Sequence, residues 1–298
     1  MLDWLVAPLT YSFMQRGLAA SLMVGVLCAV VGCYVVLRSM AFLGDAMAHA
    51  ILPGVAIAYL LKGNLLVGAL IAAVIVALSI GFLSRQGTIK EDTAIGILFA
   101  AALSLGIALI STAKTYASDL THILFGNVLG VSSGDLWLTA GVGLVVLITI
   151  ALLYKEFLVV SFDPVLAATL RLPAELLRTL MLILIALTIV VSLQTVGVGL
   201  VTAMLVTPAA TAYLLAQSLA VMMAISAVVG ALSSIMGLYL SFYINIASGA
   251  AVVLVATGIF IVVFFLAPKR GILWRHLRRP HAAGPIEHTQ SRDTDEHG

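Results

Sequence analysis

Residues 41–61 read AFLGDAMAHAILPGVAIAYLL, an apolar run that carries one acid, one histidine and a proline–glycine pair. A helix of about 20 apolar residues crosses the ~30 Å hydrocarbon core of a bilayer. This run has that length, and similar runs recur from Arg16 to Leu266. Of the 298 residues, 62% are hydrophobic and 9% are charged, whereas about a quarter of the residues in a soluble domain are charged. The sequence therefore predicts an all-helical protein embedded in a membrane.

Polar residues divide the chain into nine predicted spans. We expect them at 16–37, 41–61, 64–83, 93–112, 135–154, 174–194, 196–216, 219–243 and 246–267. If one of them crosses only half of the bilayer, the number is eight. Residues 1–15 are expected to form an interfacial segment, residues 16–268 the membrane domain, and residues 269–298 a basic and polar tail that is partly disordered. Residues 118–133 are too short to cross and are predicted to be a re-entrant or surface segment.

The basic residues are divided unequally between the two sides of this bundle. Twelve fall on one side: Arg38, Arg85, Lys90, Lys155, Arg171, Arg178, Lys269, Arg270, Arg275, Arg278, Arg279 and Arg292. Three fall on the other: Arg16, Lys62 and Lys114. Lysine and arginine concentrate on the cytoplasmic side of membrane proteins. The C-terminal tail and the loops at 84–92 and 155–173 are therefore predicted to be cytoplasmic, and nine spans would leave the N-terminus outside.

Asp45 and His49 are the strongest candidates for a metal site. Most other acids fall in loops or at span edges, but Asp45 lies inside a predicted span with His49 four residues later. Residues at i and i+4 share a helix face, with Cβ atoms about 5–6 Å apart. A carboxylate and an imidazole suit manganese, iron or zinc. The alternative is a structural Asp–His hydrogen bond that ties two helices together.

Glycine and proline interrupt several spans, and such breaks are tolerated in a membrane chiefly where they line a cavity. Gly197 and Gly199, followed by Pro208, are the best candidates for a broken helix that acts as a gate. Close packing of helices through small residues is the alternative.

Asp119 and His122 are weaker candidates. They lie on the predicted outer segment, where they could help to gather ions. A solvated or interfacial histidine is the plainer interpretation of His122.

The energy source must lie outside the chain or in an ion gradient. No lysine follows a glycine, so the Gly-Lys-Ser/Thr of a phosphate-binding loop is absent. Asp45 is the one acid well inside a span, which does not resemble a proton relay. A separate ATPase partner is therefore favoured. Residues 162–173, FDPVLAATLRLP, predict a short cytoplasmic helix that either docks on such a partner or faces lipid.

Several segments, in order, resemble the membrane subunit of ABC-type manganese, zinc and iron importers. They are LRSM at 37–40, LGDAMAHAILPG at 43–54, EDTAIG at 91–96, LFG at 124–126, FDP at 162–164, VG at 196–197 leading to TPAATA at 207–212, and SGA at 248–250. The resemblance covers about residues 10–268. One departure is Ala247, where the family pattern leads us to expect proline.

The resemblance implies an importer fold related to the vitamin B12 permeases. It implies that two copies form a homodimer on two cytosolic ATPase subunits and receive the ion from an extracytoplasmic metal-binding protein. It implies that Asp45 and His49 bind the ion in transit, and that the coupling helix meets the ATPase through Phe162, Asp163, Pro164, Ala167 and Leu170. The subunit would be no enzyme, would hold no permanent cofactor and would bind no nucleic acid. Its expected location is the bacterial inner or plasma membrane.

The expected mechanism is alternating access, with modest affinity so that the ion can leave. Other classes remain open at this stage: a secondary transporter driven by protons or sodium, a permease for a metal chelate or cobalamin, and a non-transporting scaffold or sensor. The sequence does not choose among manganese, zinc and iron, because aspartate and histidine suit all three.

Overall fold

The computed structural model describes residues 7–85, 90–112, 130–162 and 164–267. Every regular element in these ranges is a helix. Nine candidate spans, one of them made of two consecutive helices, are long and apolar enough to cross a membrane. The spanning elements are α2 (Ser12–Leu37), α3 (Leu43–Ala50) with α4 (Leu52–Leu60), α5 (Leu65–Arg85), α6 (Glu91–Ser111), α8 (Ser133–Leu152), α11 (Ala174–Val196), α12 (Val198–Leu215), α13 (Leu219–Ile244) and α14 (Ser248–Leu266). The predicted all-helical, multi-pass fold is confirmed.

The first span begins earlier than the sequence predicts. Helix α2 starts at Ser12, so residues 12–15 are part of the same helix as the predicted span, and an interfacial position for residues 1–15 stays a prediction. A short 3₁₀ helix, η1 (Ala7–Thr10), precedes it. The side-chain amide of Gln15 donates to the carbonyl of Leu9 at 2.7 Å. This contact fixes the turn between η1 and α2, which is why the polar Gln15 does not end the helix.

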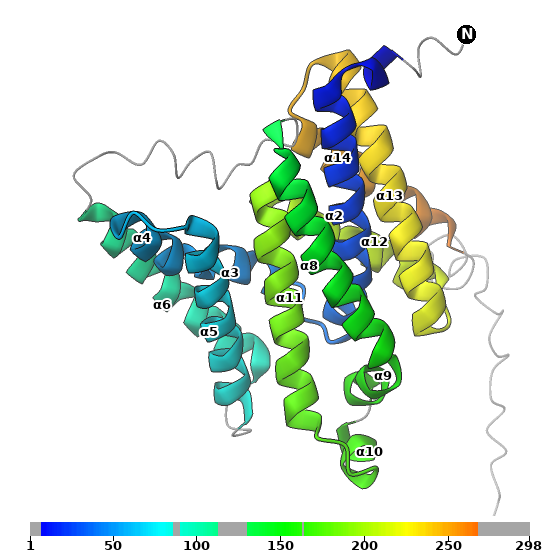
Figure 1. Cartoon of the computed structure of the whole chain (residues 1–298). Coiled ribbons are helices and arrows are strands. Elements are labelled where there is room, and N and C mark those ends of the chain that lie inside the picture. The colour runs from blue at the N-terminus through cyan, green and yellow to red at the C-terminus, as the bar shows by residue number, and fades with distance from the viewer. Residues whose placement is uncertain (1–6, 86–89, 113–129, 163, 268–298) are drawn as a thin grey trace, which may run out of the picture.

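The helices form two groups that lie side by side (Figure 1). One group contains α2, α8 and α11 to α14, with α2 packed between α12 and α13. The other contains α3 to α6 and joins the first group where α5 packs on α11 and α3 packs on α12. Because lipid is as apolar as a leucine side chain, close packing rather than the hydrophobic effect holds such helices together. The buried core draws on both groups, and the second places α3 beside α11 and α12 of the first.

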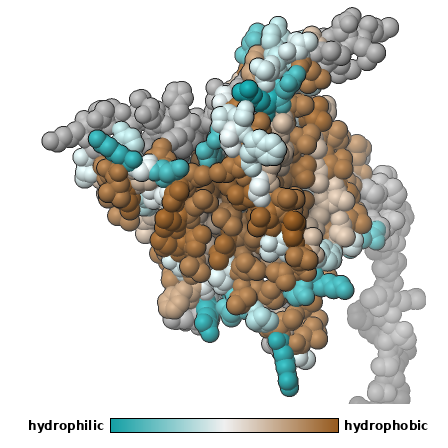
Figure 2. All heavy atoms as spheres, viewed as in Figure 1, coloured by the Kyte–Doolittle hydropathy of each residue, from teal (hydrophilic) through white to brown (hydrophobic). Residues whose placement is uncertain are grey.

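Polar and apolar surface are separated along the bundle (Figure 2). On the face shown, a hydrophobic band crosses the middle, and hydrophilic residues gather at the two ends. Among the described residues, six basic side chains lie at helix ends on the side of α10 (Pro164–Thr169), namely Arg38, Arg85, Lys90, Lys155, Arg171 and Arg178. Arg16 and Lys62 lie at the other end. The described basic residues therefore gather at one end of the bundle, as the sequence predicts. By the positive-inside rule, we still expect the α10 end to be cytoplasmic.

The broken span is not the one that the sequence favours. Helix α12 continues through Gly199 and Pro208 without interruption, so a break at either of these residues is wrong. Gly197 instead joins α11 to α12 with φ of 86°, a conformation that glycine adopts at little cost. The interrupted span is 43–60, where α3 ends at Ala50 and α4 begins at Leu52. Pro53 has no N–H to donate to the carbonyl of His49, which explains the interruption.

The predicted coupling segment contains less helix than expected. Helix α9 covers Tyr154–Phe162, and α10 ends at Thr169, before the end of the expected range 162–173. Arg171 has φ of 54°, a left-handed conformation that a helix cannot contain. The chain therefore turns after α10 and enters α11 at Ala174.

Candidate metal site

Asp45 and His49 lie on one face of α3, as their spacing predicts. The Nε2 atom of His49 is 3.7 Å from Oδ1 of Asp45, and the two side chains are 31% and 46% exposed respectively. This separation is too long for a hydrogen bond. Both residues belong to the same helix, so the alternative of an Asp–His bond that ties two helices together is wrong for this pair. The two groups are close enough to bind one cation between them.

Two aromatic side chains border this pair. The ring of Phe99 on α6 lies 6.1 Å from the ring of His49, and 5.6 Å from the ring of Phe42 in an edge-on arrangement. Phe42, the N-cap residue of α3, is 44% exposed. Phe99 therefore limits the positions of the imidazole, a contact that the sequence gives no means of predicting.

The remaining faces of α3 are buried. Leu43, Ala46, Met47 and Ala48 are each at most 2% exposed, and α3 packs against α6, α11 and α12. The two polar side chains thus point toward the open face of a helix whose other sides are covered. A charged side chain in contact with hydrocarbon costs at least ~2.5–3.5 kcal/mol. We therefore expect the open face of α3 to be covered by water or by another protein chain, and not by lipid.

The described residues of one copy do not complete a metal site. No group of three or more histidine, cysteine, aspartate or glutamate side chains comes together among the residues that the structure describes. Manganese takes about six ligands, mostly oxygens. Asp45 and His49 would supply part of such a set, and water, backbone carbonyls or a second copy would have to supply the rest.

The other predicted site residues do not join this pair. Gly197 lies at the junction of α11 and α12, and Pro208 is buried within α12. Where an added Cβ at Gly199 would lie, no other atom is within 4 Å. Helix α12 approaches α3 through Leu205, whose Cδ2 would be 2.9 Å from a Cβ at Gly44. A gating role for the α12 residues stays a prediction. Asp119 and His122 lie outside the described residues.

The coupling residues fall into two groups. Phe162 and Leu170 are 62% and 55% exposed, whereas Ala167 is fully buried. Pro164 is the first residue of α10, and Asp163 lies outside the described residues. Exposed apolar side chains at this end of the bundle, next to α9 and α10 (Figure 1), are what a cytosolic partner could cover.

A buried charge cluster brings together three residues that the sequence does not connect. Nη2 of Arg38 lies 3.0 Å from Oε2 of Glu91, and Nε of Arg178 lies 3.2 Å from Oε1 of the same carboxylate. Burial lowers the pKa of the Arg38 guanidinium, and the charge of Glu91 opposes this shift. The motifs at 37–40 and 91–96 each contain one member, but their pairing across 53 residues became visible only in the structure.

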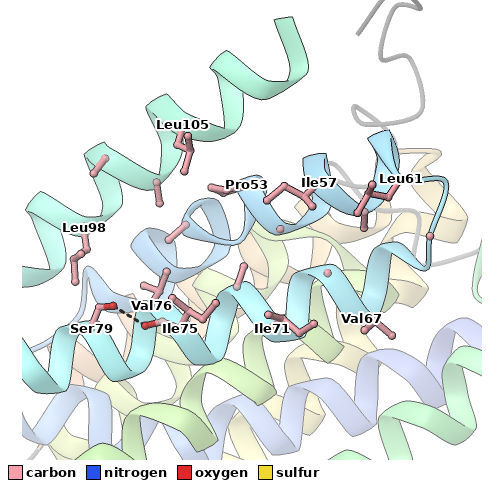
Figure 3. A pocket seen from close by; sticks show the side chains of 18 of the residues that line it. Pro53, Ile57, Leu61, Val67, Ile71, Ile75, Val76, Ser79, Leu98 and Leu105 are labelled. Atoms are coloured by element: carbon pink, nitrogen blue, oxygen red, sulfur yellow. Dashed lines mark hydrogen bonds between the residues drawn. The ribbon is translucent and has the colours of Figure 1, made fainter. Parts of the chain in front are cut away.

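An apolar groove lies beside the metal candidates and does not include them. It has a volume of about 650 Å³ and runs between α4, α5 and α6 (Figure 3). Pro53 and Ile57 of α4, Ile71 of α5 and Leu105 of α6 contribute to its walls. A lining so poor in oxygen and nitrogen cannot replace the hydration shell of a divalent cation. The groove is therefore no candidate for the ion path.

Comparison with known proteins supports the family resemblance that the sequence motifs indicate. Residues 10–267 match the family described as "ABC 3 transport family". The chain is 49% identical over 274 residues to the manganese transport system membrane protein MntC of Halalkalibacterium halodurans, covering 92% of this chain and 94% of that protein. It is 39% identical to a probable iron transport system membrane protein of Haemophilus influenzae, covering 88% and 96% of the two chains.

Among solved structures, PsaBC from Streptococcus pneumoniae in complex with Fab is similar to this chain. The TM-score is 0.79 and the identity 40%, with 92% of this chain and 98% of that chain covered. The family match extends over all nine spans and both halves of the interrupted span that carries Asp45 and His49. The chain belongs to the ABC 3 transport family, the family of membrane permeases that its motifs predict.

Proposed function

We propose that this chain is the permease subunit of an ATP-driven importer that moves manganese across the bacterial plasma membrane. The observation that carries the proposal is the open face of α3, on which a carboxylate and an imidazole lie 3.7 Å apart within a membrane-spanning segment. We propose manganese as the transported ion because MntC of H. halodurans carries that metal in its name. Iron is the second candidate, since the relative from H. influenzae is named for iron.

The ion passes between two copies of the chain. Each copy offers Asp45 and His49 on a half-exposed face, and two copies facing each other would offer two carboxylates and two imidazoles. This arrangement would shield four polar side chains from lipid and complete most of a coordination sphere. Water ligands keep the affinity modest, so the ion can leave on the inner side.

Transport follows alternating access driven by partner subunits. An extracytoplasmic binding protein delivers the ion at the outer face, and cytosolic ATPase subunits act on the other face through α9 and α10. The exposed side chains of Phe162 and Leu170 support that contact. Residues that remain candidates in this scheme are Asp163 and Ala167 at the contact, Gly197 and Pro208 at the gate, and Asp119 and His122 at the outer side.

The test is uptake of radioactive manganese by cells that carry Asp45→Asn or His49→Ala. Loss of one ligand is expected to lower uptake about tenfold or more, because metal sites lose about 10–100-fold in affinity even when only a supporting group is removed. Asp92→Asn is the matched control, since Asp92 is an exposed acid at the start of α6. Normal uptake by both site variants at normal expression would show that the ion does not use this pair.

Two further measurements separate the rival classes. Purification of the permease from its native membrane should yield an ATPase subunit with it, whereas a secondary transporter would purify without one. The metal content of cells that lack the gene, determined element by element, should show a loss of manganese. A loss confined to iron or zinc would reassign the substrate and leave the site in place.

A further inference from the structure

Glu91 lies where the ends of α2, α6 and α11 come together. Helix α2 leads into the ion-binding helix α3, and α11 follows the coupling segment. Its two carboxylate oxygens accept from different arginines, Arg38 at 3.0 Å and Arg178 at 3.2 Å. The three side chains are between 12% and 18% exposed. Such a cluster is costly to leave half-formed, because removing one partner leaves an uncompensated buried charge.

Each arginine belongs to a different part of the molecule. Arg38 is the C-cap of α2, five residues before the start of α3. Arg178 lies in the first turns of α11, directly after the α9–α10 segment. Glu91 is the first residue of α6. The carboxylate therefore connects the start of α6 with the segment that enters α3 and with the helix that leaves α10.

Further along α6, Phe99 lies next to His49 of the candidate metal site. Phe99 lies eight residues after Glu91, slightly more than two helical turns, and its ring lies 6.1 Å from the ring of His49. It also contacts Phe42 at the start of α3. A displacement of α6 would therefore act on the imidazole and on the first residue of its helix.

Backbone packing does not join α6 to α11 directly to a similar extent. Helix α6 packs chiefly on α3, α4 and α5, whereas α11 packs chiefly on α2, α5 and α8 and also touches α3. The direct ionic connection between α6 and α11 in the described ranges is the one through Glu91. A movement of α11 caused by a partner at α10 would reach α6 directly through this carboxylate, or indirectly through α5 or α3.

We propose that Glu91 is a positioning residue that makes the ion-binding helix α3 follow the movement of α11. The route runs from Arg178 through Glu91 and α6 to Phe99, His49 and Asp45. Arg38 holds the other oxygen of Glu91 and so fixes the approach to α3. This inference rests on the proposed function, because it assigns to the cluster the step that links ATP hydrolysis to the movement of the ion.

The experiment compares two rates in the same vesicles. The permease is purified with its ATPase subunits and binding protein and reconstituted, and manganese uptake and ATP hydrolysis are measured together. Glu91→Gln keeps the size of the side chain and removes its charge. We expect ions transported per ATP to fall about tenfold, within the usual range for coupling between sites, while ATP hydrolysis stays within about twofold. Asp92→Asn, one residue further on, is expected to keep the wild-type ratio.

A merely structural role gives a different result. If the cluster only stabilises the fold, Glu91→Gln will lower uptake and hydrolysis in proportion, and an unchanged ratio overturns the proposal. Arg178→Gln serves as the second variant, because it removes one arm and leaves the pair of Arg38 and Glu91 intact. Arg178→Gln should also lower the number of ions transported per ATP. The double variant of Glu91→Gln and Arg178→Gln should lower this number no further than Glu91→Gln alone, since the effects of groups that act as a unit are not additive.

The outcome is separate from that of the site experiment. If Asp45→Asn retains full uptake, the proposed ion site fails whatever the Glu91 variants do. If Asp45→Asn abolishes uptake and Glu91→Gln keeps the wild-type ratio, the site stands and the role of Glu91 is wrong.

Discussion

Single glycines decide how closely the helices of this bundle approach. A Cβ at Gly32 of α2 would overlap the carbonyl oxygen of Leu205 on α12. Gly54 of α4 and Gly68 of α5 stand in the same relation, because a Cβ on either would overlap the carbonyl of the other. Such contacts replace the hydrophobic effect as the source of helix association in lipid. The approach of α12 matters for the site, since its Leu205 also packs on Gly44, the residue before Asp45.

Gly32→Ala should therefore destabilise the protein, by about 1–3 kcal/mol as in other overpacked cores. The measurement is thermal unfolding of the purified protein in detergent, with a lower Tm expected. Gly141→Ala on α8 is the matched control, because nothing lies within 4 Å of its added Cβ. In an open helical position this change should leave Tm unchanged or slightly raised. Equal Tm values for the two variants would show that α2 and α12 can separate at no cost.

At the scale of elements, the interruption between α3 and α4 shapes the site. Asp45 and His49 occupy a helix of only eight residues, which ends three residues before Pro53. The carbonyl of His49 therefore lacks the usual donor at position 53. Gly106 of α6 fits against Leu52 and Pro53, where a Cβ would meet the side chain of Leu52 at 2.8 Å. The interruption is thus held from both sides.

Pro53→Ala should restore the missing N–H and let one helix run from Leu43 to Leu60. We expect manganese uptake to fall several-fold while Tm stays equal or rises, since proline within a helix costs about 3 kcal/mol relative to alanine. Leu60→Ala, an exposed position later on α4, is the control and should transport normally. Undiminished uptake by Pro53→Ala would mean that the interruption serves packing alone.

At the scale of the whole molecule, one copy leaves its site open. The half-exposed pair on α3 has no third ligand among the residues described, and the proposal places a second copy opposite. Mixed pairs make this testable. One copy with Asp45→Asn and one wild-type copy, carrying different affinity tags, can be purified as a pair by two successive steps and reconstituted with the ATPase subunits.

If both copies bind the same ion, mixed pairs should transport well below half as fast as wild-type pairs, because every site then lacks a carboxylate. Two independent sites would give about half of the wild-type rate in this comparison, on the additivity expected of uncoupled sites. Wild-type pairs that carry the same two tags control for the tags. A rate of one half would contradict the shared site.

Particular residues show how much of the structure could be predicted from the sequence. The spacing of Asp45 and His49 predicted a shared helix face, and local geometry alone decides that. Apolar length predicted nine spans. The broken span was misplaced, because Pro208 carries the same local preference as Pro53 but lies buried within a continuous α12, and Gly197 separates two spans instead of interrupting one. The partners of Glu91 could not be predicted, because nothing local relates residue 91 to residues 38 and 178.

The sequence by itself determined that this protein is embedded in a membrane, which stretches are long and apolar enough to cross it, and which two side chains could bind a cation, since these depend on apolar length and on helical period. Only the tertiary structure decided which face of α3 stays open, where the interrupted span lies, and which distant charges Glu91 joins. These depend on contacts between segments far apart in the chain, whose free energy no single segment contains.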